Sequence, residues 1–412
     1  MIIKDIKSAI IGNNIVLRIV TDKGVDGYSE VEEGKEFVKP LIPFFAEMIH
    51  GCDPTNVESV MRRIRRFGGY KPWGKLISSI EIALWDIAGK DAGIPVYKLL
   101  GGKVRDQVRV YNGSFKNPNP PHAIADTPEK QGENILALNE IPEGFTIVKG
   151  GGVFHGYAHS NFFTANKVTD YAYNVYPPVP QATRHSPYNM GGLLTEKGLN
   201  YYIDYVARIK SVVKDKVGLA FDIGPGIAAP DALKLAKAFE PFNLLWLEDT
   251  IAGDYTPYTL AHVYRDITMN TTTPIHTGEQ IYLRQNFREL IETHAVNVIG
   301  PDPADVGGIA ELKWIAEYAD IHGILIAPHG TIDGLFGMAA LTHVCAAMPD
   351  NYIAYEYPAG NPGWWYDIVD GLPDPLLKDG HINIWDKPGL GIEFNVNKAS
   401  KYLQPEDKDF FL

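Results

Sequence analysis

Cysteine is scarce in this sequence, and long apolar runs are missing from it. Its two cysteines, Cys52 and Cys345, lack the short spacing of a metal-binding or redox pair. A disulfide framework is therefore excluded, and we expect a reducing compartment, the cytoplasm. No apolar run is long enough to span a bilayer, and the N-terminus carries charges and asparagines that are unlike a signal peptide.

Positive charge is also in short supply. Lysine and arginine number 38 against 50 aspartate and glutamate residues, which gives a net charge of -12. Nucleic acids and anionic membranes repel such a protein, so we expect neither as a partner. An anionic small molecule would need local compensation by lysine, histidine or a metal ion.

The 412 residues are enough for two domains. Residues 1 to about 34 alternate apolar and polar side chains around turns, which is typical of a small antiparallel sheet. Residues 78–94 predict a helix with a broad apolar face that ends near Gly89 or Gly93. We predict an α+β domain over residues 1–106, to which the strand-like tail at 379–412 returns.

Short β-branched runs alternate with amphipathic segments between about residues 107 and 378. This order is typical of βα units around a parallel sheet, and eight strands are enough to close a barrel of the TIM type. The predicted strands cover residues 108–111, 145–149, 217–222, 244–249, 274–279, 296–302, 323–329 and 352–357. The sequence therefore predicts an α/β barrel over residues 107–378.

One connection in this region is unusually long, at about residues 150–198. Loops of this length are usually functional or disordered. The segment is rich in Tyr, Phe, His, Asn and Pro, unlike a charge-rich disordered linker. We interpret it as an ordered lid or a subunit contact.

Three acidic residues stand at the ends of three successive predicted strands: Asp222 in GLAFDIG, Glu248 in LLWLEDT and Glu279 in PIHTGEQ. A parallel barrel brings the carboxyl ends of its strands to one rim, where these carboxylates would converge. Taken singly, each could be a solvated loop acid or a helix cap. Together they form an oxygen-only ligand set that suits a hard divalent cation such as Mg²⁺.

Four further segments make the chain resemble the enolase superfamily and, within it, the mandelate racemase-like group (the mandelate racemase/muconate lactonizing enzyme family). They are, in chain order, SSIEIALWDIAGKDAGIPVYKLLGG, PDPADVGGIAE, GILIAPHG and DKPGLGIEF. The resemblance implies an α+β capping domain on a modified (β/α)₇β barrel. It also implies one Mg²⁺ per subunit, abstraction of the proton α to a substrate carboxylate, and an assembly of an even number of identical subunits.

Carried over position by position, the resemblance assigns roles to individual residues. The implied metal ligands are Asp222, Glu248 and Glu279. The implied base is His329, with Asp302 on its second ring nitrogen to fix the tautomer. Asp305 is an alternative partner for His329, and it could instead cap the following helix.

Lys149 and Glu356 complete the implied site. A protonated Glu356 could donate a hydrogen bond to the substrate. Lys149 matches the first lysine of the family's Lys-x-Lys pair, where it would place positive charge beside the substrate or, with its pKa lowered by burial, transfer a proton. Gly151 stands where the second lysine is common. Racemisation needs that second base, whereas His329 could serve dehydration as base and acid in turn.

The substrate contacts are less specifically indicated. Gly224 occupies a position where some acid-sugar dehydratases carry histidine, which disfavours mannonate-type dehydration. With glycine at position 224, the general acid could come from the long insertion, whose candidates are His155, His159 and His185. In RFGGYKPWG (66–74), Tyr70 and Trp73 suit a flap that stacks on a sugar chain, or they could simply pack between the domains.

We therefore expect a Mg²⁺-dependent lyase that dehydrates a sugar acid to a 2-keto-3-deoxy acid. A racemase, epimerase or cycloisomerase of the same superfamily is the alternative. Two other classes are a glycoside hydrolase, which needs two carboxylates and no metal, and a binding protein that kept the fold without the chemistry. Inhibition by a chelator would argue against the glycoside hydrolase, and turnover would argue against the binding protein.

Overall fold

The structure is a computed structural model. It describes residues 1–12, 14–31, 36–68, 73–123, 125–155, 194, 196–224, 226–251, 260–330, 334–357 and 363–412. The candidate residues Tyr70, His159 and His185 lie outside these ranges, as does most of the predicted insertion. Of Trp73 and His155, the backbone alone is described.

A three-stranded antiparallel sheet and three helices form the N-terminal part of the chain. The strands are β1 (Ile3–Ile11), β2 (Asn14–Thr21) and β3 (Gly27–Val31), which pair in chain order. The helices are α1 (Ile42–Ile49), α2 (Val57–Ile64) and α3 (Trp73–Ala92). Apolar residues of all six elements share one core, as the alternating pattern of the strands predicts.

Helix α3 differs from its prediction in length and in the role of one glycine. Gly93 has a φ of 69° just after the last turn, which fits the predicted end. Gly89 does not end the helix. A Cβ atom there would lie 2.7 Å from the Cα of Gly389, so Gly89 allows the C-terminal segment to approach the helix closely.

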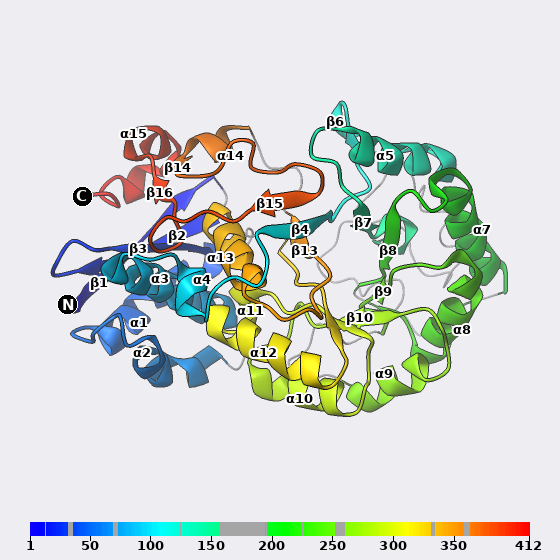
Figure 1. Ribbon diagram of the computed structural model, residues 1–412, viewed down its shortest axis with the longest axis horizontal. Helices are drawn as coiled ribbons and strands as arrows, with labels where there is room; N and C mark the ends of the chain where they lie inside the picture. The colour runs from blue at the N-terminus through cyan, green and yellow to red at the C-terminus, as the bar shows by residue number, and fades with distance from the viewer. Residues whose placement is uncertain are drawn as a thin grey trace.

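Eight parallel strands form the barrel (Figure 1). They are β4 (Gln107–Asn112), β7 (Ile147–Gly150), β8 (Gly218–Asp222), β9 (Leu247–Glu248), β10 (Ile275–Thr277), β11 (Val298–Ile299), β12 (Leu325–Ile326) and β13 (Tyr355–Tyr357). Seven of them follow one another in the sheet from β4 to β12, and β13 pairs with β4. A parallel bridge between Ile326 and Tyr352, just before β13, closes the ring. The predicted α/β barrel is confirmed.

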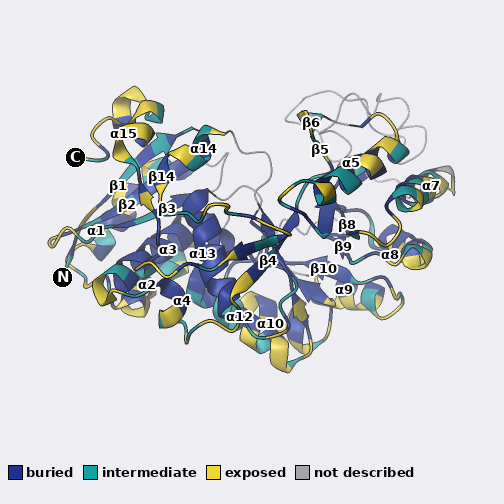
Figure 2. Cartoon of the chain, turned by 45° about the horizontal axis from the view of Figure 1, so that its top comes forward, coloured by how far each residue is buried: buried dark blue, intermediate teal, exposed yellow. Residues whose placement is uncertain are grey.

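Among the described residues, a helix of eight or more residues follows each of the first seven strands. These are α5 (Pro128–Glu140), α7 (Glu196–Val213), α8 (Ala229–Phe239), α9 (Ala261–Thr268), α10 (Arg284–Glu292), α12 (Ile309–Ile321) and α13 (Leu335–Ala346). Figure 2 shows exposed outer faces on α5, α7 and α8, whereas α3 and α13 are largely buried. Across the described ranges, no helix combines the length and apolarity that a bilayer crossing requires.

The C-terminal tail contacts both parts of the chain. β15 (His381–Asn383) pairs antiparallel with β4 of the barrel and not with the N-terminal sheet, although its alternating pattern suits either. The chain reaches the N-terminal sheet further on, where Leu403 forms a bridge with Ile11 of β1. The boundaries of the two domains stay a prediction.

Polar contacts join the N-terminal part to the barrel at two helix N-termini. Glu81 of α3 accepts hydrogen bonds from the backbone N–H groups of Ile309 (2.7 Å) and Ala310 (3.0 Å), at the start of α12. Glu30 of β3 accepts one from Phe336 (2.9 Å) at the start of α13. Both carboxylates are buried, and each satisfies N–H groups that have no partner within their helix.

Candidate active site

Strand register brings acidic residues together at one rim of the barrel. Asp222 of β8 pairs with Glu248 of β9, and Glu248 pairs with His276 of β10. Residues that face each other across neighbouring strands share a face of the sheet, so these side chains point the same way. The apolar runs before Asp222 and Glu248 are buried in the core, and each run ends at its acid, where the strand reaches the rim.

A compact group of carboxylates lies at this rim. Oxygen atoms of Asp222, Glu248 and Asp249 lie within 4.8 Å of one another, and all three residues are buried. Such hard oxygen donors fit a divalent cation. Asp249 is a member that sequence analysis did not predict. Its φ of 47° breaks the alternation of the strand, and its Oδ1 accepts a hydrogen bond from Thr277 (2.8 Å).

Glu279 lies apart from this compact group. It follows Gly278, whose φ of 130° turns the chain out of β10. Its Oε2 lies 3.3 Å from Nε2 of His329, and its Oε1 accepts a hydrogen bond from Gln280 (2.8 Å). The carboxylate thus lies between the barrel rim and the histidine, and its assignment as a metal ligand stays a prediction.

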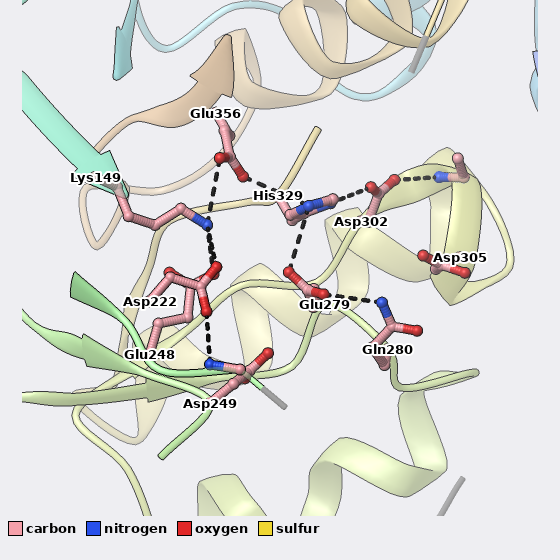
Figure 3. Close-up of polar contacts among 12 residues, drawn as sticks. Lys149, Asp222, Glu248, Asp249, Glu279, Gln280, Asp302, Asp305, His329 and Glu356 are labelled. Carbon is pink, nitrogen blue, oxygen red and sulfur yellow. Dashed lines mark hydrogen bonds and ion pairs between the residues drawn. The ribbon is translucent and has the colours of Figure 1, made fainter. Parts of the chain in front are cut away.

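His329 and Asp302 form a buried pair (Figure 3). Nδ1 of His329, just after β12, lies 2.7 Å from Oδ2 of Asp302. Asp302 begins the short helix α11 (Pro303–Val306), and its Oδ1 accepts a hydrogen bond from the N–H of Ala304 (2.7 Å). With Nδ1 held by Asp302, Nε2 is the nitrogen that faces the other carboxylates.

The charge around His329 favours its protonated form. Burial by itself lowers the pKa of the ring, but the carboxylates of Glu279, Glu356 and Asp302 raise that pKa well above its ordinary value. Oε2 of Glu356 lies 3.6 Å from Nε2 of His329. The imidazolium is therefore strongly stabilised in this site.

Lys149 lies among the carboxylates on the other side of Glu356 (Figure 3). Its Nζ is 2.6 Å from Glu248, 3.3 Å from Glu356 and 3.4 Å from Asp222. Burial lowers its pKa, yet these three carboxylates outweigh burial and raise the pKa well above the ordinary value. These carboxylates hold Lys149 in its charged form, and proton transfer by Lys149 beside a bound Mg²⁺ stays a prediction.

The contacts bear on the choice between Asp302 and Asp305 as the partner of His329. Asp305 does not contact His329; its Oδ2 lies 2.5 Å from Nζ of Lys75 in α3. Asp302 is therefore the partner of the histidine. Gly224, at the position where a histidine was considered, donates its backbone N–H to Oδ1 of Asp222 (2.9 Å).

Comparison with known protein families agrees with this geometry. Residues 7–101 match the mandelate racemase / muconate lactonizing enzyme N-terminal domain, and residues 187–399 match the family described as enolase C-terminal domain-like. The chain belongs to the mandelate racemase-like group of the enolase superfamily. Enzymes of the enolase superfamily use a divalent metal, and the carboxylate group at the barrel rim could hold one.

Similar proteins of this superfamily match almost the whole chain. The D-xylonate dehydratase of Haloferax volcanii is 30% identical over 97% of this chain and 89% of its own. The D-galactonate dehydratase of Ralstonia pickettii is 28% identical over 92% and 88%. The crystal structure of a mandelate racemase/muconate lactonizing enzyme-like protein from Rubrobacter xylanophilus has a TM-score of 0.77 and 28% identity, and covers 98% of both chains.

Proposed function

We propose that this enolase-superfamily member dehydrates a sugar acid to a 2-keto-3-deoxy acid in a Mg²⁺-dependent reaction. The observation that carries the proposal is the pairing of His329 with Asp302, which directs a single ring nitrogen toward the carboxylates of Glu279 and Glu356. The similar dehydratases of D-xylonate and D-galactonate support the substrate class.

Asp222 and Glu248 are the proposed ligands of the metal. The third ligand is Glu279, as the resemblance implies, or Asp249, whose oxygen lies in the compact group. A bound Mg²⁺ stabilises the negative charge that develops on the substrate carboxylate when the α-proton leaves. Lys149 adds a fixed positive charge at the same place and so favours an anionic substrate.

His329 moves the protons in the proposed reaction. A cation held by the rim carboxylates would offset the negative charge that raises the pKa of His329 and so would favour a neutral ring. Nε2 of the neutral ring removes the proton from C2, while Asp302 holds the proton on Nδ1 and stabilises the imidazolium that forms. The C3–O bond then breaks, and His329 returns the proton to the departing hydroxyl group, which leaves as water. The resulting enol takes up a proton at C3 and becomes the 2-keto-3-deoxy acid. In this proposal Glu356 holds an oxygen of the substrate.

Racemisation and epimerisation are less well supported by these residues. They need a second base on the opposite face of C2, and Gly151 offers no side chain at the position where the family commonly has lysine. Dehydration needs one residue that acts as base and then as acid. His329, held by Asp302, can meet that need.

The test is a screen of the purified protein with Mg²⁺ against mono- and diacid sugars that include D-xylonate and D-galactonate. We expect a 2-keto-3-deoxy acid to form from at least one of them, and to disappear with a chelator or in the His329→Asn variant. Turnover that survives the chelator would contradict the metal dependence. A reaction that leaves the C3 hydroxyl in place would favour the isomerase alternative.

A further inference from the structure

The two oxygens of Glu248 face different surroundings, although the side chain is fully buried. Oε1 lies 2.6 Å from Nζ of Lys149, on the side of the other charged residues. Oε2 accepts a hydrogen bond from the indole N–H of Trp246 at 2.9 Å. One oxygen is thus held by a neutral, fully buried donor, and the other remains on the side of the proposed metal site.

Backbone geometry fixes this hydrogen bond. Trp246 precedes Glu248 by two residues in an extended segment, so the two side chains lie on the same face. His276, which pairs with Glu248 in the neighbouring strand, stacks on the indole with ring centroids 5.3 Å apart and an angle of 22° between the planes. Nδ1 of His276 also lies 3.3 Å from Oε2 of Glu248, so this ring supports both the indole and the carboxylate.

The stack has little freedom to move. The ring of Tyr111 packs edge-on against Trp246 with centroids 5.5 Å apart, and both residues are fully buried. Any side chain at Gly300 would overlap the ring of His276, so that ring lies directly against the backbone of the next strand. A donor fixed in this way sets the direction of the carboxylate plane of Glu248.

We infer that Trp246 is a positioning residue for the metal ligand Glu248. By holding Oε2, it leaves Oε1 to bind the cation and prevents the carboxylate from turning. The inference rests on the proposed function, because it assumes that Glu248 binds Mg²⁺. Partners that orient a ligand in this way typically contribute about 10- to 100-fold to metal affinity.

The test compares Mg²⁺ binding by the full-length protein and two variants, measured by isothermal titration calorimetry without substrate. Trp246→Phe removes the indole N–H and keeps an aromatic ring. Trp385→Phe is the matched control, since the buried indole of Trp385 donates a hydrogen bond of the same length, 2.9 Å, to the carbonyl of Leu390 in the C-terminal tail. Thermal unfolding in the presence of a chelator checks that each variant folds.

We expect Trp246→Phe to bind Mg²⁺ about 10- to 100-fold more weakly, while Trp385→Phe stays within about threefold of the unaltered protein. Unchanged binding by Trp246→Phe would overturn the inference, and so would equal weakening in both variants, which would indicate a general loss of packing. Failure of the unaltered protein to bind Mg²⁺ would instead refute the proposed metal site itself, and this inference with it.

If Trp246→Phe does not fold, the unaltered protein supplies a second readout. With ¹⁵N-labelled tryptophan, the indole N–H resonance of Trp246 is assigned by its through-space contacts with the ring of Tyr111. Mg²⁺ should shift this resonance and leave that of Trp385 in place. A Trp246 resonance that does not respond to saturating Mg²⁺ would contradict the inference.

Discussion

At the residue scale, the site depends on how each oxygen of Asp302 is used. Oδ1 accepts a hydrogen bond from the N–H of Ala304, and Oδ2 holds Nδ1 of His329. The carboxylate therefore caps a short helix and orients the histidine at the same time. Replacing it with an amide would preserve its shape but remove the negative charge that favours the imidazolium.

We predict that Asp302→Asn lowers kcat by a factor of about 10² to 10⁴, the usual range for general acid–base catalysis, and changes KM much less. Steady-state kinetics on the substrate found in the screen gives both constants. Circular dichroism before and after heating shows whether the variant is folded. A variant with kcat close to that of the unaltered enzyme would contradict the assignment of Asp302.

The resemblance to the mandelate racemase-like group assigned His329, Asp302, Lys149 and Glu356 to one site, and their side chains lie close together there. The pattern of acids at strand ends by itself indicated only Asp222, Glu248 and Glu279. It did not find Asp249. Successive residues of a regular strand point to opposite faces, so a regular strand would direct Asp249 away from Glu248. At Asp249, a backbone φ of 47° changes the direction of the side chain. In the sequence, the one sign of a further acidic ligand was the pair of neighbouring acids in LEDT.

At the scale of elements, Glu81 connects helix α3 to the N-terminus of α12. Burial raises the pKa of Glu81 to about 7, although hydrogen bonds from Ala310 and Ile309 oppose the shift. The folded state therefore holds the proton more tightly than the unfolded chain, in which the pKa is near 4.5. The resulting stabilisation is complete below about pH 4.5 and is lost as the pH rises toward 7.

We predict that Glu81→Gln reduces the loss of stability between pH 5 and pH 8, because a glutamine cannot ionise. The expected difference in the free energy of unfolding is on the order of 3 kcal/mol. Urea denaturation of both proteins at the two pH values measures it. Parallel pH dependence in the two proteins would show that Glu81 does not titrate in this way.

The buried pair of Lys75 and Asp305 is a second link between α3 and the barrel, with 2.5 Å between Nζ and Oδ2. Lys75→Met would leave Asp305 as a buried charge without this ammonium, and we predict a destabilisation of about 3–5 kcal/mol. The double variant Lys75→Met/Asp305→Leu should recover much of that loss. Chemical denaturation at pH 7.5 measures the free energy of unfolding of both variants and the unaltered protein. A Lys75→Met variant as stable as the unaltered protein would contradict the predicted role of the pair.

The order of elements was predictable from the sequence, and their extent was not. All eight predicted barrel strands are present, but β9, β11 and β12 are two residues long where runs of six or seven residues were expected. Apolar runs indicate which part of the chain is buried, whereas strand length depends on which backbone groups remain paired in a curved sheet. An apolar pattern also does not show which strand a segment pairs with, and β15 was therefore not assigned to the barrel.

At the scale of the whole molecule, an acidic chain holds a buried lysine at its proposed active site. Lys149 is buried among carboxylates, although the net charge of the protein is -12. We expect the affinity for an anionic substrate to depend on Lys149 and the proposed metal. That the charge of the substrate is compensated locally stays a prediction.

We also predict an assembly with an even number of identical subunits, from the family resemblance and the aromatic insertion at 150–198. Multi-angle light scattering should give a mass that is an even multiple of 45.6 kDa. A mass of one chain at micromolar concentration would refute this prediction. It would leave the chemistry of the site unaffected.

The measurement that tests the central claim most directly is the reaction in deuterated water, followed by NMR with Mg²⁺ and the substrate found in the screen. We predict a 2-keto-3-deoxy acid that carries one solvent-derived deuterium at C3, and no product with His329→Asn. Deuterium at C2 of an otherwise intact substrate would contradict dehydration and indicate racemase or epimerase chemistry. Product formation at an unchanged rate by His329→Asn would contradict the role of the histidine.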